Sequence, residues 1–288
     1  MNMNKMKKYF YLFAAICTMA MFTACSSDDD DKQPAPGEVL PEIVGTWNLA
    51  PAEYEDDGWG GLVVVGGPVV IDWQCTEGTI LNIPMGEGYN LPLEINTTLA
   101  PLTENLANTY MPTLLQSVTF EANGDITAVY GEDSNDEGDG EEEDDNDEVG
   151  YTEENATHVW KTATGYAHWK PTSSSDVIYV YLDSEKILAS EEDAESKGAL
   201  SEILDMFKDG IPVHIRWNAD KTSPFFYVDL EYIKPMILGL SGFASKLPTD
   251  DMDEEDLQTV AMLQGILGQM PEIMDNTQKF EAGLQLVK

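Results

Sequence analysis

The stretch Ile43-Val44-Gly45-Thr46-Trp47-Asn48-Leu49 is the first strand-like run of the chain and opens the segment that we expect to fold. Similar runs follow at short intervals, separated by turns rich in Gly, Pro and Asn. Few of these runs alternate with helical patterns, so the strands are expected to pair in antiparallel order. The predicted fold class is mostly β with added helices (α+β), as an antiparallel β-barrel of about ten strands.

Three features set the expected strand pairing. The Asn-Gly pair at residues 123–124 lies between two β-rich runs and is the strongest hairpin signal, because both residue types tolerate positive φ. The runs 157–161 and 166–170 are expected to form another hairpin around residues 163–165. The last run, 280–287, is expected to close the barrel against the first strand.

One later run alternates between two kinds of side chain. Ile178, Val180 and Leu182 share one face, and Tyr179 and Tyr181 share the other. The alternation predicts a strand with one face toward the core. Two arrangements fit: the aliphatic side chains inside with the tyrosines outside, or the tyrosines lining a cavity.

Helical periodicity is expected mainly in the second half of the chain. The segments are residues 101–115, 184–209 in one or two pieces, a helix that starts at Pro235, and 251–269. Pro112 is expected to end or kink the first helix and Pro271 to lie just past the last one, because proline lacks the N–H that a helix interior needs.

The N-terminal segment is basic, then apolar, and leads to Cys25. Its apolar run, 9–22, has the length of a signal-peptide core and is too short to span a bilayer as a helix. The sequence Phe-Thr-Ala-Cys at residues 22–25 resembles a bacterial lipobox, whose cysteine is acylated after cleavage. Residues 1–24 are therefore interpreted as a lipoprotein signal peptide and Cys25 as the lipidation site. The alternative is an ordinary signal peptide that is cut nearby.

The acidic residues after Cys25 are interpreted as a second targeting signal. Residues 26–31, Ser-Ser and four aspartates, resemble the export signal of surface lipoproteins in some Gram-negative bacteria. This resemblance implies an outer-membrane protein, attached through the lipid on Cys25, that faces the cell exterior; the alternative is a solvated acidic spacer. Residues 25–40 are interpreted as an acidic, Pro- and Gly-containing tether.

The charge of the chain argues against nucleic-acid binding, and its cysteine content excludes a disulfide-stabilised fold. Loss of residues 1–24 would change the net charge from −38 to −41, and such a chain repels nucleic acid, so no nucleic-acid partner is expected. Besides Cys25, only Cys75 remains in the mature chain, so no intramolecular disulfide can form. Cys75 ends an apolar strand and is read as a buried, inert thiol, with a reactive thiol as the alternative.

A low-complexity acidic tract interrupts the folded region. The insertion 131–149 has no large apolar cluster to bury, so it is expected to be disordered within a single domain, 41–288. Five of its residues match an EF-hand calcium-loop template, namely Asp133, Asn135, Glu137, Gly138 and Asp144. Flanking helices are not expected, and so acidic a run produces such matches by chance. No metal site and no cofactor are therefore predicted.

No catalytic motif occurs in the sequence. Its histidines, His158, His168 and His214, show no metal-binding spacing, and no nucleophile elbow, P-loop or HExxH is present. Carboxylate pairs are too numerous for one to stand out as a glycosidase pair. The chain is therefore not predicted to be an enzyme.

Gly45 and Trp47 match a short family signature. Gly45-Thr46-Trp47 resembles the Gly-x-Trp motif in the first strand of lipocalin-like (calycin-like) β-barrels, and the whole chain resembles lipocalin-like surface lipoproteins of Gram-negative bacteria. The resemblance implies a tethered barrel in which the tryptophan plugs one end under a basic side chain, usually supplied from near the last strand. The protein is expected to be a monomer. It also implies a small apolar or amphiphilic ligand in the barrel mouth.

Arg216 is the only arginine of the chain. Three roles are open for it: a cation–π contact over Trp47 at the barrel end, an anion-binding role together with His214 inside a cavity, or an outward position paired with surface acids. The sequence does not choose among them.

Two binding functions and an enzyme remain as hypotheses. The first is a surface lipoprotein that binds a small apolar or amphiphilic ligand in an enclosed cavity. The second is a glycan- or protein-binding module on a filled barrel, using exposed aromatic residues such as Tyr54 and Trp59. An enzyme would instead need a cleft with a carboxylate pair of perturbed pKa.

Overall fold

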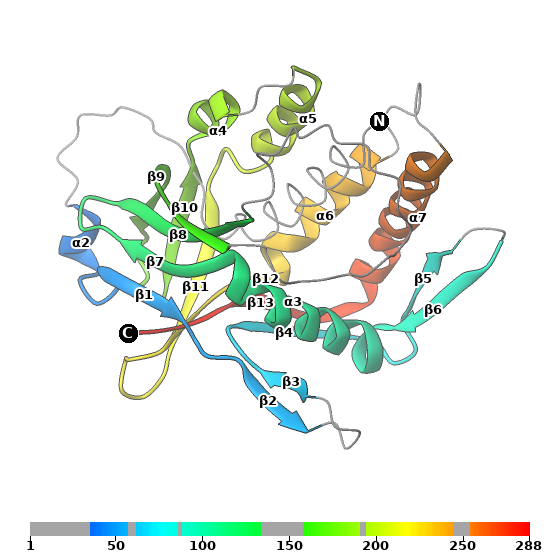
Figure 1. Ribbon diagram of the computed structural model, residues 1–288, viewed down its shortest axis with the longest axis horizontal. Helices are drawn as coiled ribbons and strands as arrows, with labels where there is room; N and C mark the ends of the chain where they lie inside the picture. Colours follow the sequence, from blue (N-terminus) through cyan, green and yellow to red (C-terminus); the bar gives the residue numbers. More distant parts are fainter. Residues whose placement is uncertain (1–34, 57–61, 86–87, 134–157, 191–193, 245–253) are drawn as a thin grey trace, which may run out of the picture.

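The computed structural model describes residues 35–56, 62–85, 88–133, 158–190, 194–244 and 254–288. Its central feature is a closed, antiparallel β-barrel of eight strands (Figure 1). The strands follow the order β1 (Gly45–Leu49), β7 (Leu115–Phe120), β8 (Asp125–Asp133), β9 (His158–Pro171), β10 (Val177–Leu182), β11 (Ile211–Trp217), β12 (Pro224–Asp229) and β13 (Thr277–Val287). The barrel closes where β13 pairs with β1, with Asn48 opposite Val287 and Leu49 opposite Leu286.

This architecture confirms the predicted α+β fold class and the antiparallel barrel. The hairpin expected at residues 123–124 joins β7 to β8, and Gly124 takes a φ of 100° there. The last strand closes the barrel against the first, as predicted. No helix among the described residues is both long and apolar enough to cross a membrane.

Side chains from alternate strand positions fill the barrel interior. In β11, Ile211, Val213 and Ile215 are buried, whereas the residues between them reach the surface. Phe120 stacks on Phe226 with 5.2 Å between the ring centroids. Together with tryptophans from other strands, these side chains form the main hydrophobic core.

β10 resolves the two arrangements that its alternation allowed. Ile178 and Val180 are buried in the barrel core, and Tyr179 lies on the outer face with 36% of its surface exposed. The aliphatic side chains are therefore inside and the tyrosines outside.

The segment between β1 and β7 forms an insertion beside the barrel. It contains β2 (Glu53–Asp56), β3 (Leu62–Gly66), β4 (Val69–Cys75), β5 (Ile80–Pro84), β6 (Asn90–Glu94), the π-helix η1 (Ile95–Leu99) and α3 (Ala100–Leu114). β2 pairs with β3 and β5 with β6, whereas β4 pairs with β13 and extends the barrel sheet by one strand. A short helix, α2 (Pro36–Val39), precedes β1.

Side chains of η1 and α3 cover the outer edge of β4. The Asn108 side chain accepts a hydrogen bond from the Val69 N–H and donates one to the Val69 carbonyl, both at 2.8 Å. Glu104 accepts from the Ile71 N–H at 2.8 Å, and Asn96 bonds both backbone groups of Cys75. These side chains take the place of a neighbouring strand, so these backbone groups of the edge are satisfied.

Four further helices follow the barrel strands: α4 (Ser184–Ser190), α5 (Ala194–Asp205), α6 (Leu230–Ala244) and α7 (Glu254–Asn276). α4 and α5 lie beside one end of the barrel (Figure 1), and Leu200 and Leu204 of α5 join its core. α7 packs on α6 and β5, where residues such as Ile273 and Met274 form a second core.

The structure corrects three local predictions. The expected hairpin over 157–170 is a single strand, β9, because Gly165 (φ 72°) lies at an irregularity in the pairing with β8 and not in a turn. α6 begins before Pro235 and α7 continues through Pro271. Residues 131–133 of the expected acidic insertion belong to β8, and its remainder lies outside the described residues.

Candidate functional site

The signature residues belong to the first barrel strand, β1. Gly45 begins β1 with a φ of 126°, and the Trp47 side chain is fully buried. The Trp47 Nε1–H donates to the Ile43 carbonyl at 2.7 Å. The Trp217 ring meets the Trp47 ring edge-on, with 5.8 Å between centroids. Trp47 therefore has a packing role in the core.

Lys288, and not Arg216, covers the Trp47 ring. Its Nζ lies 4.6 Å from the ring centroid, immediately after β13. The Arg216 guanidinium lies instead over Tyr227, at 4.7 Å from that ring. The reading of Arg216 as the barrel-end contact is therefore corrected. The signal that points to Lys288 is its position after the last strand, where the resemblance places the basic residue.

Arg216 and His214 point away from the barrel interior. Both belong to the set of β11 residues that alternates with the buried ones, and more than half of the Arg216 side chain is exposed. They do not line an internal cavity. Of the three roles open for Arg216, the structure supports the outward position paired with an acid.

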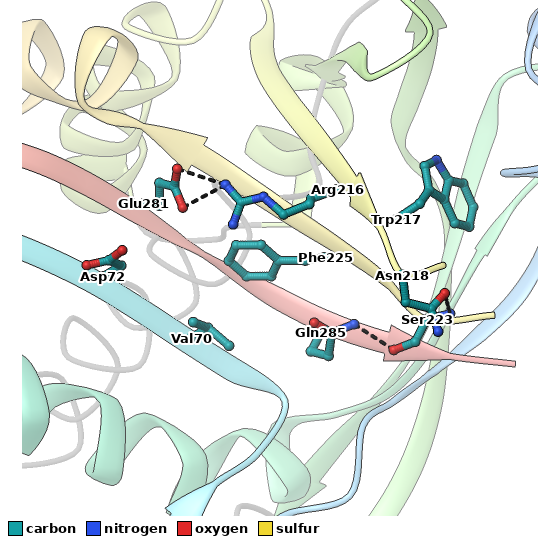
Figure 2. Close-up of a pocket in the computed structure, with 9 residues that line it drawn as sticks. All are labelled: Val70, Asp72, Arg216, Trp217, Asn218, Ser223, Phe225, Glu281 and Gln285. Carbon is teal, nitrogen blue, oxygen red and sulfur yellow. Dashed lines mark hydrogen bonds and ion pairs between the residues drawn. The ribbon is translucent and has the colours of Figure 1, made fainter. Parts of the chain in front are cut away.

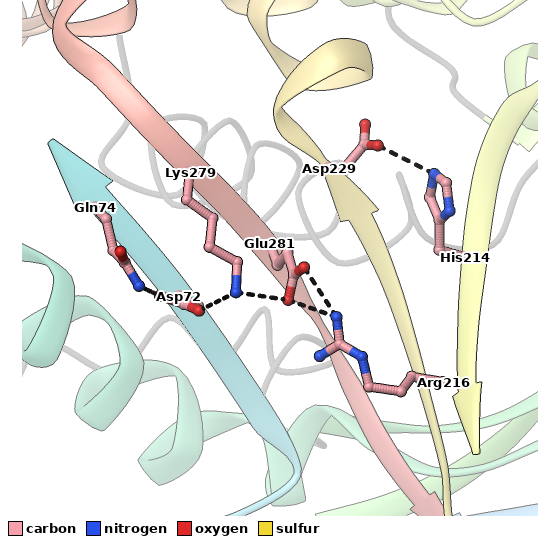
Figure 3. A network of polar contacts seen from close by, with 7 residues as sticks. All are labelled: Asp72, Gln74, His214, Arg216, Asp229, Lys279 and Glu281. Carbon is pink, nitrogen blue, oxygen red and sulfur yellow. Dashed lines mark hydrogen bonds and ion pairs between the residues drawn. The ribbon is translucent and has the colours of Figure 1, made fainter.

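Ion pairs connect Arg216 to β13 and β4 (Figure 3). Its Nη2 donates to both carboxylate oxygens of Glu281 at 2.9 Å. Glu281 Oε2 also lies 3.4 Å from the Lys279 Nζ, which donates to Asp72 at 2.5 Å. Asp72 in turn accepts from Gln74. Side chains of β11, β13 and β4 thus share one network of alternating charges, which passes over the intervening β12.

The network shifts the pKa values of its members. The hydrogen bond from Lys279 lowers the pKa of Asp72, and the same bond raises the pKa of Lys279. The hydrogen bond to Glu281 raises the pKa of Arg216. All three groups therefore remain charged at neutral pH.

An aromatic stack lies beside the network on β11 and β12. The rings of Phe225 and Tyr227 are stacked with centroids 5.0 Å apart, and Tyr227 stacks on His214 at 5.2 Å. His214 Nε2 lies 3.2 Å from an Asp229 carboxylate oxygen. The Phe225 ring is covered by the Arg216 side chain and is almost fully buried.

These groups border a surface hollow of about 310 Å³, which we call the outer-face hollow (Figure 2). Its lining consists of Val70, Asp72, Arg216, Trp217, Asn218, Ser223, Phe225, Glu281 and Gln285. Gln285 donates to the Ser223 hydroxyl at 2.6 Å, and Asn218 accepts backbone N–H groups of its own loop. Apolar surface therefore lies next to a guanidinium, carboxylates and amides.

The sequence alone indicated only one lining residue of this hollow, Arg216. The others come from four strands and one loop, and only the pairing of β12 with β13 and of β13 with β4 brings them together. Phe225 and Gln285, for example, are opposite each other in that register. Alternation within the runs 225–231 and 280–287 could have shown which residues of each strand lie on the same side of the sheet. It could not have shown that these strands lie next to β4.

The remaining predicted positions lie apart from the hollow. Tyr54 is exposed on β2, and Cys75 is buried beside the Thr277 hydroxyl, where burial raises the pKa of its thiol. Cys25, Trp59 and most of the calcium-loop positions lie outside the described residues. Within the described ranges, no group of His, Cys, Asp and Glu side chains is arranged to hold a metal ion.

The chain was compared with protein families, curated proteins and solved structures. No protein-family model, curated protein or solved structure matches this chain.

Proposed function

We propose that this chain is a lipid-anchored, lipocalin-like surface lipoprotein that binds a neutral carbohydrate in the outer-face hollow. The observation that carries the proposal is the composition of that hollow, in which an aromatic floor adjoins planar polar side chains. We therefore prefer a glycan ligand to a small apolar one, and we place it in the hollow and not on Tyr54 and Trp59.

The packed interior supports a site on the outside. Phe120, Trp169 and Phe226 are nearly or fully buried, and the Phe120 ring packs on both of the others inside the barrel. Interiors packed in this way leave no room for a ligand of drug-like size. The support for a small apolar ligand inside the barrel is correspondingly weak.

The donors and acceptors of the hollow suit sugar hydroxyls. A hydroxyl both donates and accepts, so it can bridge a carboxylate such as Asp72 and a guanidinium such as Arg216. The Arg216 Nη2 is held by Glu281, which fixes the guanidinium at the border of the hollow. The apolar faces of sugar rings can pack on the half-buried side chains of Val70 and Trp217, which also line the hollow.

Charge argues for a neutral ligand. The chain carries a net charge of −38, and the hollow is lined by the carboxylates of Asp72 and Glu281 besides the Arg216 guanidinium. An anionic ligand would be repelled by this field, whereas a neutral polyhydroxylated ligand would not. A protein partner is less well suited, because stable protein interfaces take about 20–30 residues on each side and nine residues line this hollow.

Binding is tested by titrating the full chain, in detergent, with maltohexaose, cellohexaose, xylohexaose and chitohexaose in a calorimeter. We expect at least one to bind, and Arg216→Gln to weaken that binding at least tenfold. Lys234→Gln, which removes a surface ion pair with Asp275 elsewhere, is the matched control and should bind normally. Binding of none of the four, or equal binding by Arg216→Gln, would refute the proposal.

The lipid anchor is proposed on the residues around Cys25 alone. Metabolic labelling with an alkyne-tagged palmitate in a Gram-negative host should label the chain, and Cys25→Ala should abolish the label. Cys75→Ala, which alters the other cysteine of the mature chain, should retain it. Persistent labelling of Cys25→Ala would contradict the anchor.

A further inference from the structure

We infer that the carbohydrate-binding surface continues from the outer-face hollow across β11 to Tyr179 and Tyr181, so that its ligand is an oligosaccharide and not a single sugar. This inference rests on the function proposed above and specifies the ligand of the same site. We call Tyr179 and Tyr181 of β10 the tyrosine pair.

The tyrosine pair forms an aromatic surface on the outside of the barrel. The ring centroids lie 6.0 Å apart and the rings are tilted by 35°. Tyr179 is exposed and Tyr181 half-buried, with the Lys170 Nζ 4.9 Å from the Tyr181 ring. Rings placed side by side in this way offer successive stacking positions to a ligand that extends along them.

Gly210 allows both rings to lie against the backbone. It has a φ of 83°, and a Cβ at this position would come 2.8 Å from Tyr181 and 3.2 Å from Tyr179. Any other residue would displace one or both rings. The orientation of the tyrosine pair is therefore set by the chain that enters β11.

A continuous row of side chains joins the tyrosine pair to the hollow. Tyr179 is opposite Pro212 in the register of β10 and β11, and His214 is the next residue of β11 on the same face. His214 stacks on Tyr227, and Tyr227 stacks on Phe225 in the hollow. Phe225 is buried and these rings face one another, so what the row offers a ligand is the half-exposed edges of His214 and Tyr227, which continue the apolar surface from the tyrosine pair to the hollow.

The length of this path exceeds one sugar ring. Arg216 lies four residues beyond Pro212, so the Tyr179 and Arg216 backbones are roughly 14 Å apart, given strand spacings of about 4.8 Å and rises of about 3.3 Å per residue. A monosaccharide in the hollow cannot reach the tyrosine pair. A linear oligosaccharide can occupy both ends.

The number of sugar units in the ligand provides the test. The full chain is titrated with two to six units of the oligosaccharide series that binds, and we expect affinity to rise at least tenfold between the disaccharide and the hexasaccharide. Tyr179→Ala should remove this gain while leaving disaccharide binding unchanged. Tyr179→Phe, which retains the ring, should preserve it, and Tyr89→Ala, at an exposed tyrosine on the β5–β6 turn, is the matched control.

The results separate the two proposals. If no member of the four series binds, the carbohydrate function itself fails and the extended surface with it. If an oligosaccharide binds with an affinity that does not depend on length, or if Tyr179→Ala behaves as the unaltered chain does, the hollow alone binds the ligand and this inference is wrong. Unchanged melting temperatures would show that the variants remain folded.

Discussion

The hydroxyl of Tyr232 is the one buried side-chain polar atom without a hydrogen-bond partner among the described residues. Burial strongly raises the pKa of this phenol, because the ionised form would lose its hydration. An unsatisfied buried group of this kind costs about 1–3 kcal/mol.

Tyr232→Phe should therefore increase the free energy of unfolding by about 1 kcal/mol. It should also remove an alkaline loss of stability, since the unfolded phenol ionises above pH of about 10 while the folded one stays neutral. Urea titrations at pH 8 and pH 10.5 measure both effects. A variant less stable than the original at pH 8 would mean that the hydroxyl has a partner.

Asp72 gives stability an acid dependence of the opposite sign. Because Lys279 lowers its pKa in the folded state, the stabilisation is complete above the unfolded value and is lost as the pH falls below about 4. Asp72→Asn should flatten the fall in melting temperature between pH 5 and pH 3. Asp205→Asn is the control, because Asp205 is the last residue of α5 and does not belong to the network. Parallel curves for Asp72→Asn and the original chain would contradict this reading.

At the scale of elements, the pairing of α3 with the edge of β4 is open to a direct test. Asn108 is 1% exposed, and its side chain bonds both the N–H and the carbonyl of Val69. Asn108→Leu keeps the size of the side chain but leaves two backbone groups without partners, so we expect a loss of about 3 kcal/mol in the free energy of unfolding.

Leu106→Ala is the control for that substitution. It alters an exposed residue of the same helix and should cost less than about 1 kcal/mol. Urea denaturation followed by circular dichroism measures both variants. Equal stabilities would mean that α3 does not protect the β4 edge.

For the whole molecule, closure of the barrel depends on the short pairing of β13 with β1. Leu286 is fully buried and lies opposite Leu49 in that pairing. Leu286→Ala should cost about 2–5 kcal/mol, because it leaves a cavity where the barrel closes, whereas Leu238→Ala at an exposed site should cost less than about 1 kcal/mol. Guanidinium titrations would measure the difference, and two equal losses would refute it.

Local pattern predicted most strands and their antiparallel pairing. Residues 123–124 identified the β7–β8 hairpin, and the final run was correctly expected to close the barrel. The same local reading was wrong at Gly165, since positive φ serves a bulge as well as a turn. It was also wrong at Pro271, where buried neighbours such as Met270 and Met274 offset the cost of proline within α7.

The sequence by itself determined the periodicities of the chain and, with them, the fold class. Those depend on neighbours a few residues apart, whose faces a strand or helix sets directly. The tertiary structure alone decided that Arg216 meets Glu281, that Lys288 covers Trp47, and that the hollow lies outside the barrel. These contacts join residues far apart in the chain, and their strand register follows from the packing of the whole core, which no local pattern contains.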